Sequence, residues 1–124
     1  MNPLLLIVTL GTMTVTAYQP IPAQTKPECV NRYHCTTSID DGITMYGCAV
    51  SQDMLRSGIV KYGDVLSIPG VGLRVVNDTM NARHKRSVDV LVFSYEEERN
   101  VGIHQLPIKR VRQARVKDLP KVSQ

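Results

Sequence analysis

Asp89 is the residue of this chain whose surroundings best suit acid–base chemistry. It is the only charged residue among residues 87–93, and all the others after position 87 are apolar. Side chains of an extended strand alternate between two faces, so Asp89 is expected to share a face with Leu91 and Phe93. Apolar surroundings raise the pKa of a carboxyl group, which a general acid working near neutral pH requires. The alternative is a structural carboxylate that caps a loop or pairs with a nearby cation, namely Arg83, Lys85 or Arg86.

The other acidic residues are first interpreted as structural. Asp78 follows an apolar run and is expected to form an Asx-turn at the end of a strand. Residues 40–42 are typical of a turn, and Asp53 of the start of a short helix. The three histidines lack the spacing of a metal site, and the chain has no phosphate-binding loop, serine elbow or HExxH pattern. We therefore expect neither a metal nor a cofactor.

The chain has three cysteines, Cys29, Cys35 and Cys48. An odd count in an exported chain allows one disulfide and leaves one thiol. Cys29 and Cys35 are close enough in sequence to form a bridge, whereas Cys48 begins an apolar run and is expected to be a small buried hydrophobic residue. A zinc site that adds His34 to the cysteines does not fit the short knuckle spacings, and nothing marks a nucleophilic cysteine.

Short strand-like runs at fairly even spacing predict an all-β sandwich or barrel that positions these residues. Between two of the runs, Pro69 and Gly70 predict a turn, because Pro presets φ and Gly supplies a positive φ. The chain has no Trp and one Phe, so the core must be aliphatic. The predicted strands cover residues 13–18, 47–51, 65–68, 73–76, 88–93 and 104–108.

Two short helices are expected between the strands. Ser94 and Glu97 form a capping box for one of them, and Gly102 can end it. A second helical turn is expected at residues 51–57. Residues 19–46 form a long polar segment, and loops of that length in compact domains are usually functional.

Length and composition limit the class of protein. A chain of 124 residues fits one domain. No apolar run reaches the ~18–20 residues of a membrane-spanning helix. Length and composition together exclude multidomain enzymes, coiled coils and polytopic membrane proteins. Residues 4–10 are apolar and followed by small residues, in the outline of an export signal, although no Lys or Arg precedes them. The rival interpretation is a buried strand, which Val8 and the threonines after it favour.

Positive charge is concentrated at the C-terminal end of the chain. The net charge is +4, and residues 109–124 carry six basic side chains against one aspartate. This tail would contact an anionic polymer or membrane, or would simply be solvated. The basic run at 83–86 lacks aromatic partners for base stacking, so no nucleic acid is expected. The expected organisation is an N-terminal segment at 1–12, a barrel domain at 13–108 and a basic tail at 109–124.

Four motifs resemble those of the three-aspartate (3D) domain family. Asp-Thr-Met-Asn-Ala-Arg at 78–83, followed by Val-Asp-Val at 88–90, is similar to the family's D-T-M-N-x-R…V-D-I/L block. Thr-Ala-Tyr-Gln-Pro at 16–20 resembles its T-A-Y-x-P opening. Ile-Pro-Gly-Val-Gly at 68–72 resembles its IPGYG turn, and residues 41–47 resemble its DG-x-TASG stretch.

This resemblance implies a mainly β fold, a six-stranded double-psi β-barrel with one or two short helices. The same barrel forms the catalytic domain of membrane-bound lytic transglycosylase A. The implied activity is cleavage of peptidoglycan glycan strands without water, between N-acetylmuramic acid and N-acetylglucosamine, which leaves a 1,6-anhydro end. Because the C6 hydroxyl of the sugar is itself the nucleophile, one carboxyl group can serve first as acid and then as base.

By position in the motifs, Asp89 corresponds to the acid/base aspartate and Asp78 to a supporting one. Where the family has its first aspartate, this chain has Ser51, so either an acid two residues later takes over that place or the place is lost. The residues expected to bind the glycan are Thr44, Asn81 and Asp53.

Such an enzyme would act on peptidoglycan outside the cytoplasm, exported to the periplasm or cell wall or carried in a phage particle with virion or lysis partners. Two alternatives remain, because a fold does not fix the chemistry. One is a glycan-binding module without activity, and the other is a virion structural protein with a vestigial site.

Overall fold

The computed structural model describes residues 7–19, 36–40 and 43–113, and the side chains of residues 7–19 and 46–113. Seven strands and two short helices lie in these ranges. They are β1 (Val8–Tyr18), β2 (Thr36–Asp40), β3 (Ile43–Val50), α1 (Gln52–Ser57), β4 (Val65–Ile68), β5 (Gly72–Thr79), β6 (Ser87–Leu91), α2 (Tyr95–Val101) and β7 (His104–Arg112). Neither helix is long and apolar enough to cross a membrane.

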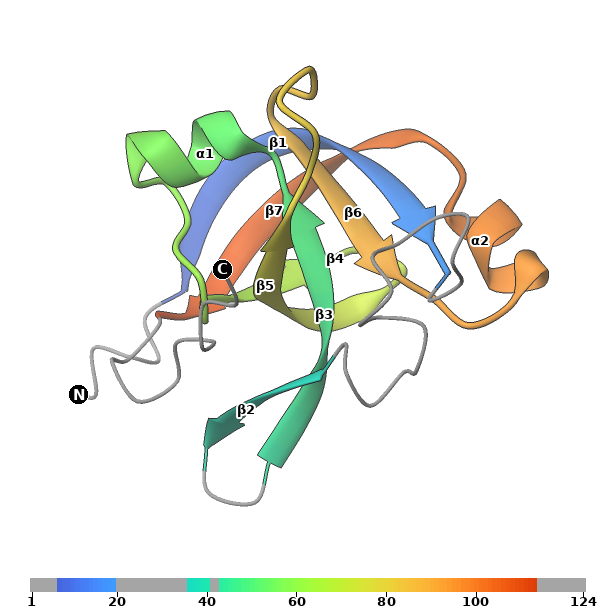
Figure 1. Cartoon of the computed structure of the whole chain (residues 1–124), viewed down its shortest axis with the longest axis horizontal. Helices are drawn as coiled ribbons and strands as arrows, with labels where there is room; N and C mark the ends of the chain where they lie inside the picture. The colour runs from blue at the N-terminus through green and yellow to red at the C-terminus, as the bar shows by residue number, and fades with distance from the viewer. Residues whose placement is uncertain (1–6, 20–35, 41–42, 114–124) are drawn as a thin grey trace.

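Six of the strands close into a barrel (Figure 1), which confirms the expected fold class. The strand order is β3–β5–β4–β7–β1–β6, and β6 pairs back with β3. The β1–β6 and β3–β5 pairs are parallel, whereas the other neighbours are antiparallel. The pairings are the same when β1, β3 and β4 are exchanged, in that order, with β5, β6 and β7. The barrel therefore consists of two interlocked halves of equal connectivity, as in a double-psi barrel.

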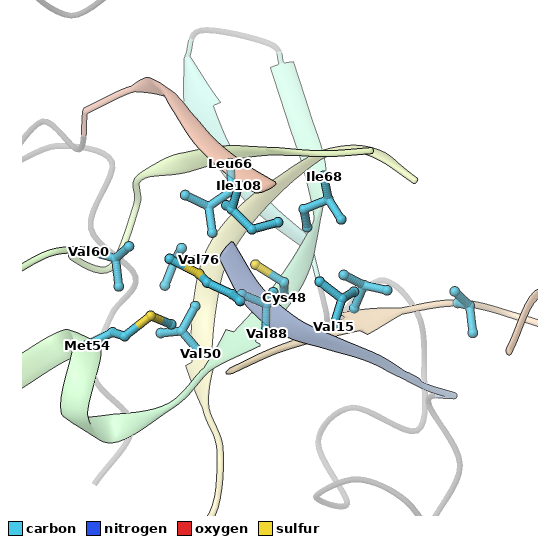
Figure 2. Packing of buried hydrophobic residues seen from close by; sticks show 13 residues of the cluster. Val15, Cys48, Val50, Met54, Val60, Leu66, Ile68, Val76, Val88 and Ile108 are labelled. Carbon is cyan, nitrogen blue, oxygen red and sulfur yellow. The ribbon is translucent and has the colours of Figure 1, made fainter. Parts of the chain in front are cut away.

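The barrel interior is aliphatic, as the lack of Trp and the single Phe predict. Each barrel strand contributes at least one fully buried side chain, and Met54 of α1 extends the core beyond the strands (Figure 2). Because strand side chains alternate, the residues between these core positions face the outer side of the barrel. The core cluster consists of Met13, Val15, Cys48, Val50, Met54, Val60, Leu66, Ile68, Val76, Val88, Val90, Val92 and Ile108.

The turn and the helix cap predicted from the sequence both form. In the turn between β4 and β5, the N–H of Val71 donates to the carbonyl of Ile68 over 3.0 Å, and Gly70 has a φ of +78°. At the start of α2, the Ser94 hydroxyl accepts from the N–H of Glu97 over 3.1 Å. The Ser94 cap starts α2 shortly after the carboxyl end of β6.

The strands at both ends of the barrel domain extend beyond the predicted boundaries. β1 begins at Val8 and pairs with β7, which runs to Arg112. Arg110, assigned above to the basic tail, donates to the carbonyl of Ile59 over 3.2 Å and lies 4.0 Å from the Asp64 carboxylate. The strand from Val8 agrees with the rival interpretation of the N-terminal segment. The end of β7 is rich in basic residues, so its composition did not identify it as strand.

β2 is the strand that the sequence analysis missed, inside the predicted loop at 19–46. It pairs with β3 alone, outside the closed barrel, and Figure 1 shows this hairpin projecting from the barrel. Its sequence, Thr-Thr-Ser-Ile-Asp, lacks the apolar pattern by which a core strand is recognised.

Candidate functional site

Four aligned residues form a row across the outer face of the barrel. Thr16 of β1 is aligned with Asp89 of β6, Asp89 with Ala49 of β3, and Ala49 with Asp78 of β5. Directly opposed residues of a sheet share a face. The core positions next to them in sequence, such as Val88 and Val90, point inward, so this row points outward.

The row brings together the two aspartates that the sequence analysis placed at the centre of the chemistry. Asp78 and Asp89 flank Ala49 from opposite sides, so their Cα atoms lie two strand spacings apart, about 10 Å. Ala49 is small and buried, so only a methyl group lies between the two acidic positions. The structure therefore places both carboxyl groups on one outward face.

Asp89 is half-buried, and a hydroxyl group is its hydrogen-bond partner. The Thr16 Oγ1 donates to the Asp89 Oδ1 over 2.8 Å. Burial raises the pKa of Asp89 from its ordinary value of 3.8 to about 6, although the hydrogen bond from Thr16 acts in the opposite direction. Within the described part of the chain, neither Lys nor Arg forms an ion pair with Asp89; Arg86 instead donates to the carbonyls of Leu10 and Thr12. The proposed ion pair of Asp89 is therefore not formed there.

Two further titratable residues act on Asp89 from outside its own strand. His84, in the connection between β5 and β6, lowers the pKa of Asp89, and Glu98 of α2 raises it. Glu98 accepts from the Gln19 Nε2 over 2.8 Å, which links α2 to the end of β1. Neither residue could be connected with Asp89 from the sequence, because no local spacing relates them to it. Only the tertiary structure brings them to the site.

Asp78 acts on Asp89 through its charge. Its Oδ1 accepts from the N–H of Thr79 over 2.8 Å, a local bond of the kind expected at a strand end. The charge of Asp78 also raises the pKa of Asp89. Asp78 thus favours the protonated form of the neighbouring acid, the form that a general acid needs at the start of its cycle.

A bulge determines which residue of β5 takes part in the row. The β3–β5 register shifts between Cys48 and Ala49, so Asp78 rather than Asn77 lies opposite Ala49. The Asn77 side-chain amide occupies the space where a Cβ on Gly47 would be. Gly47 therefore permits this close approach, which gives a physical reason for glycine at that place in the sequence.

Asp53 lies in a different set of contacts, in the first turn of α1. Its Oδ2 accepts from the N–H of Arg86 over 3.1 Å. Desolvation opposes ionisation, but hydrogen bonds from Ser51 and from the Arg86 backbone outweigh it and lower the pKa of Asp53. Arg86 has a φ of 40°, a left-handed conformation that non-glycine residues rarely adopt, and the bond helps to hold it. Asp53 thus has a structural role, and its role at a substrate stays a prediction.

The remaining predicted glycan-binding residues differ in what the structure says of them. Asn81 is exposed in the β5–β6 connection, where its Oδ1 accepts from the N–H of Arg83 over 3.1 Å and its carbonyl accepts from the N–H of His84 over 3.0 Å. It therefore shapes the turn that carries His84. Thr44 belongs to β3, and its side chain lies outside the described residues.

Cys48 is a core residue, as predicted. It is fully buried, and burial raises the pKa of its thiol to about 12, which leaves it protonated and unreactive. Cys29, Cys35 and His34 lie outside the described residues, so the disulfide between the first two stays a prediction.

In the described ranges, no group of three His, Cys, Asp or Glu side chains could hold a metal ion. A scan against protein-family models gave no match for this chain, and a search of curated proteins found no similar sequence either. The site is therefore characterised by its own geometry: a half-buried carboxyl with a raised pKa, a hydroxyl bonded to it, and a second carboxylate on the same face.

Proposed function

We propose that this chain is a peptidoglycan lytic transglycosylase of the three-aspartate domain family. The observation that carries the proposal is the state of Asp89. This outward-facing carboxyl has a pKa raised to about 6 by burial, and it accepts a hydrogen bond from the Thr16 hydroxyl. A carboxyl of this kind is substantially protonated near pH 6 and changes its protonation state readily, as a residue that acts first as acid and then as base must.

In the proposed reaction, Asp89 donates its proton to the oxygen of the glycosidic bond as that bond breaks. The resulting carboxylate then accepts the proton of the C6 hydroxyl while this oxygen attacks the anomeric carbon. The products are a shortened glycan and a 1,6-anhydro sugar, with no water consumed, and Asp89 regains its proton. Because both partners of the ring closure belong to one sugar, a second carboxylate to activate water is unnecessary.

Asp78 and Thr16 would support the two halves of this cycle. The negative charge of Asp78 favours protonated Asp89 before the reaction. The same charge would stabilise the positive charge that develops on the sugar ring. The Thr16 hydroxyl donates to the carboxylate that forms after the first proton transfer. Thr44, Asn81 and Asp53 are proposed glycan contacts.

An enzyme with this substrate would act outside the cytoplasm, in the cell envelope or from a phage particle. Its partner would be the peptidoglycan glycan strand. Lys109 and the basic residues after it could add contacts to an anionic polymer or membrane. These settings follow from the proposed substrate and are part of the same proposal.

The test is to incubate the purified chain with peptidoglycan and analyse the released fragments by mass spectrometry. Wild-type protein should release anhydro-muropeptides, and Asp89→Asn should lose this activity by a factor of at least about 100 while remaining folded. Asp64→Asn is a poor control because Asp64 is buried, so exposed Glu96→Gln on α2 serves as the matched acid-to-amide variant and should keep full activity.

The activity should also depend on pH in a defined direction. The reaction begins with protonated Asp89, so the rate should fall as pH rises above about 6. Equal product from Asp89→Asn would refute the proposed acid. Retention on peptidoglycan with no released product, in wild type and variant alike, would instead identify a glycan-binding module.

A further inference from the structure

A cavity of about 400 Å³ lies between the β4–β5 turn, α2 and the start of β7. Val92 and Leu106 supply apolar wall from the barrel, and Val101 supplies it from α2. Arg74 and Glu97 contribute charged groups to the same lining. A volume of this size with apolar walls and a few convergent polar groups is typical of a small-molecule site.

Arg74 supplies a positive charge to this cavity, and its guanidinium group is incompletely hydrogen-bonded. Its Nη1 donates to the carbonyl of Leu73 over 2.9 Å, and its guanidinium lies 6.0 Å from the centre of the Tyr46 ring. Its Nε is buried and has no hydrogen-bond partner among the described residues, which also provide no carboxylate in an ion pair with it. Partial burial of a guanidinium without an anion is unfavourable, so a ligand that supplies one is stabilised there.

The lining also limits which anion fits. A guanidinium presents a planar fork of donors that matches a carboxylate. Glu97 carries a negative charge in the same cavity, which disfavours a doubly charged group such as a phosphate monoester. The Glu97 carboxylate and the Asn100 side chain can instead accept a hydrogen bond from an amide N–H.

We propose that this cavity binds a small carboxylate with an amide-containing, partly apolar body, such as the C-terminal end of a short acylated peptide, with its carboxylate on Arg74. The residues that carry the proposal are separate from Asp89, so it does not depend on the acid–base chemistry proposed there. Val92 and α2 connect the two places, since β6 carries Asp89 and ends just before Val92, and α2 carries both Glu97 and Glu98.

The experiment is a titration of isotope-labelled protein with N-acetyl-alanyl-alanine, followed by NMR through the backbone amide signals. Saturable shifts are expected around the cavity, in residues 70–74 and 97–106. The same compound with its C-terminal carboxylate converted to an amide should bind at least about tenfold more weakly, because it lacks the charge that Arg74 recognises.

Substitutions in the cavity test where the peptide acid binds. Arg74→Gln should weaken binding at least about tenfold, and Asn100→Trp should weaken it by filling the cavity while leaving the guanidinium in place. The matched control is Arg56→Gln on α1, which Figure 1 shows on the opposite side of the barrel from α2, and it should bind as wild type does.

Equal binding of the acid and the amide would overturn the proposal, as would shifts confined to other parts of the chain. Should Arg74→Gln fail to fold, the comparison of acid with amide on wild-type protein still decides. The variant Asp89→Asn separates this proposal from the proposed function, because it should lose glycan cleavage and keep full binding of the peptide acid.

Discussion

Asp89 and Thr16 form the contact on which the proposed chemistry depends most directly. Two effects oppose one another at this carboxyl group. Burial of the Asp89 side chain favours the protonated acid, whereas the 2.8 Å bond from the Thr16 hydroxyl favours the carboxylate. Burial is the larger effect, so the pKa is raised to about 6. A general acid and base needs a pKa near its working pH, and the two effects together give Asp89 such a value.

Removing the hydroxyl of Thr16 should move the pH dependence of the activity. In Thr16→Val the carboxylate loses a donor, so the pKa of Asp89 rises and the alkaline limb of the rate profile shifts to higher pH. Thr16→Ser keeps the hydroxyl and is the control, with a limb close to that of wild type. The measurement is the rate of anhydro-muropeptide release between pH 4 and 9, and an unshifted limb in Thr16→Val would exclude this role.

At the scale of elements, β3 holds the central place in the site. It pairs with β5 on one side and β6 on the other, so Ala49 aligns both Asp78 and Asp89. The bulge next to Ala49 determines that an aspartate rather than Asn77 faces outward in line with it. α1 follows β3 and is joined to the residue just before β6 by the hydrogen bond from the N–H of Arg86 to Asp53.

The contact between α1 and the start of β6 supports a prediction about Asp53. Asp53→Ala removes the acceptor for the N–H of Arg86 and should lower the free energy of unfolding by about 1 kcal/mol. Asp53→Asn keeps an acceptor oxygen and should lose less. Urea denaturation measures both, and glycan cleavage by the folded variants separates the structural role from a substrate contact. Full activity in Asp53→Ala would leave the residue only its structural role, whereas lost activity with unchanged stability would assign it to the substrate.

At the scale of the whole molecule, ionisation of the half-buried Asp89 destabilises the folded barrel. The closed barrel buries part of an acid that has no cation as an ion-pair partner among the described residues. The folded protein therefore holds the proton of Asp89 up to about pH 6, whereas the unfolded chain releases it near 3.8. Between these values the folded state binds more protons, so its stability falls as pH rises, and the loss is complete above about pH 6.

This relation predicts how Asp89→Asn changes stability with pH. An amide has no ionisation penalty, so the variant should be more stable than wild type at pH 7.5, by about 1–3 kcal/mol given partial exposure, and should gain much less at pH 4. Urea denaturation of both proteins at the two pH values measures the difference, with Glu96→Gln as the exposed control. A gain that does not depend on pH would show that the carboxyl is not held in its protonated form by the fold.

The sequence alone determined the elements with strong local signals. Short strand-like runs at fairly even spacing indicated the six barrel strands, Pro69 with Gly70 indicated a turn, and Ser94 with Glu97 indicated the start of a helix. It also identified Asp89 as an acid among apolar neighbours. These features could be predicted because each depends on residues a few positions apart.

The tertiary structure decided everything that depends on strand pairing. Strand order and register placed Asp78 and Asp89 on one outward face. They also brought His84 and Glu98 near Asp89, whereas Asp53 lies in a separate contact with Arg86. The tertiary structure also added β2 and the outer ends of β1 and β7, which form hydrogen-bonded pairs with a neighbouring strand. Such pairings join residues that are far apart in sequence, so the local composition does not indicate which strands become neighbours.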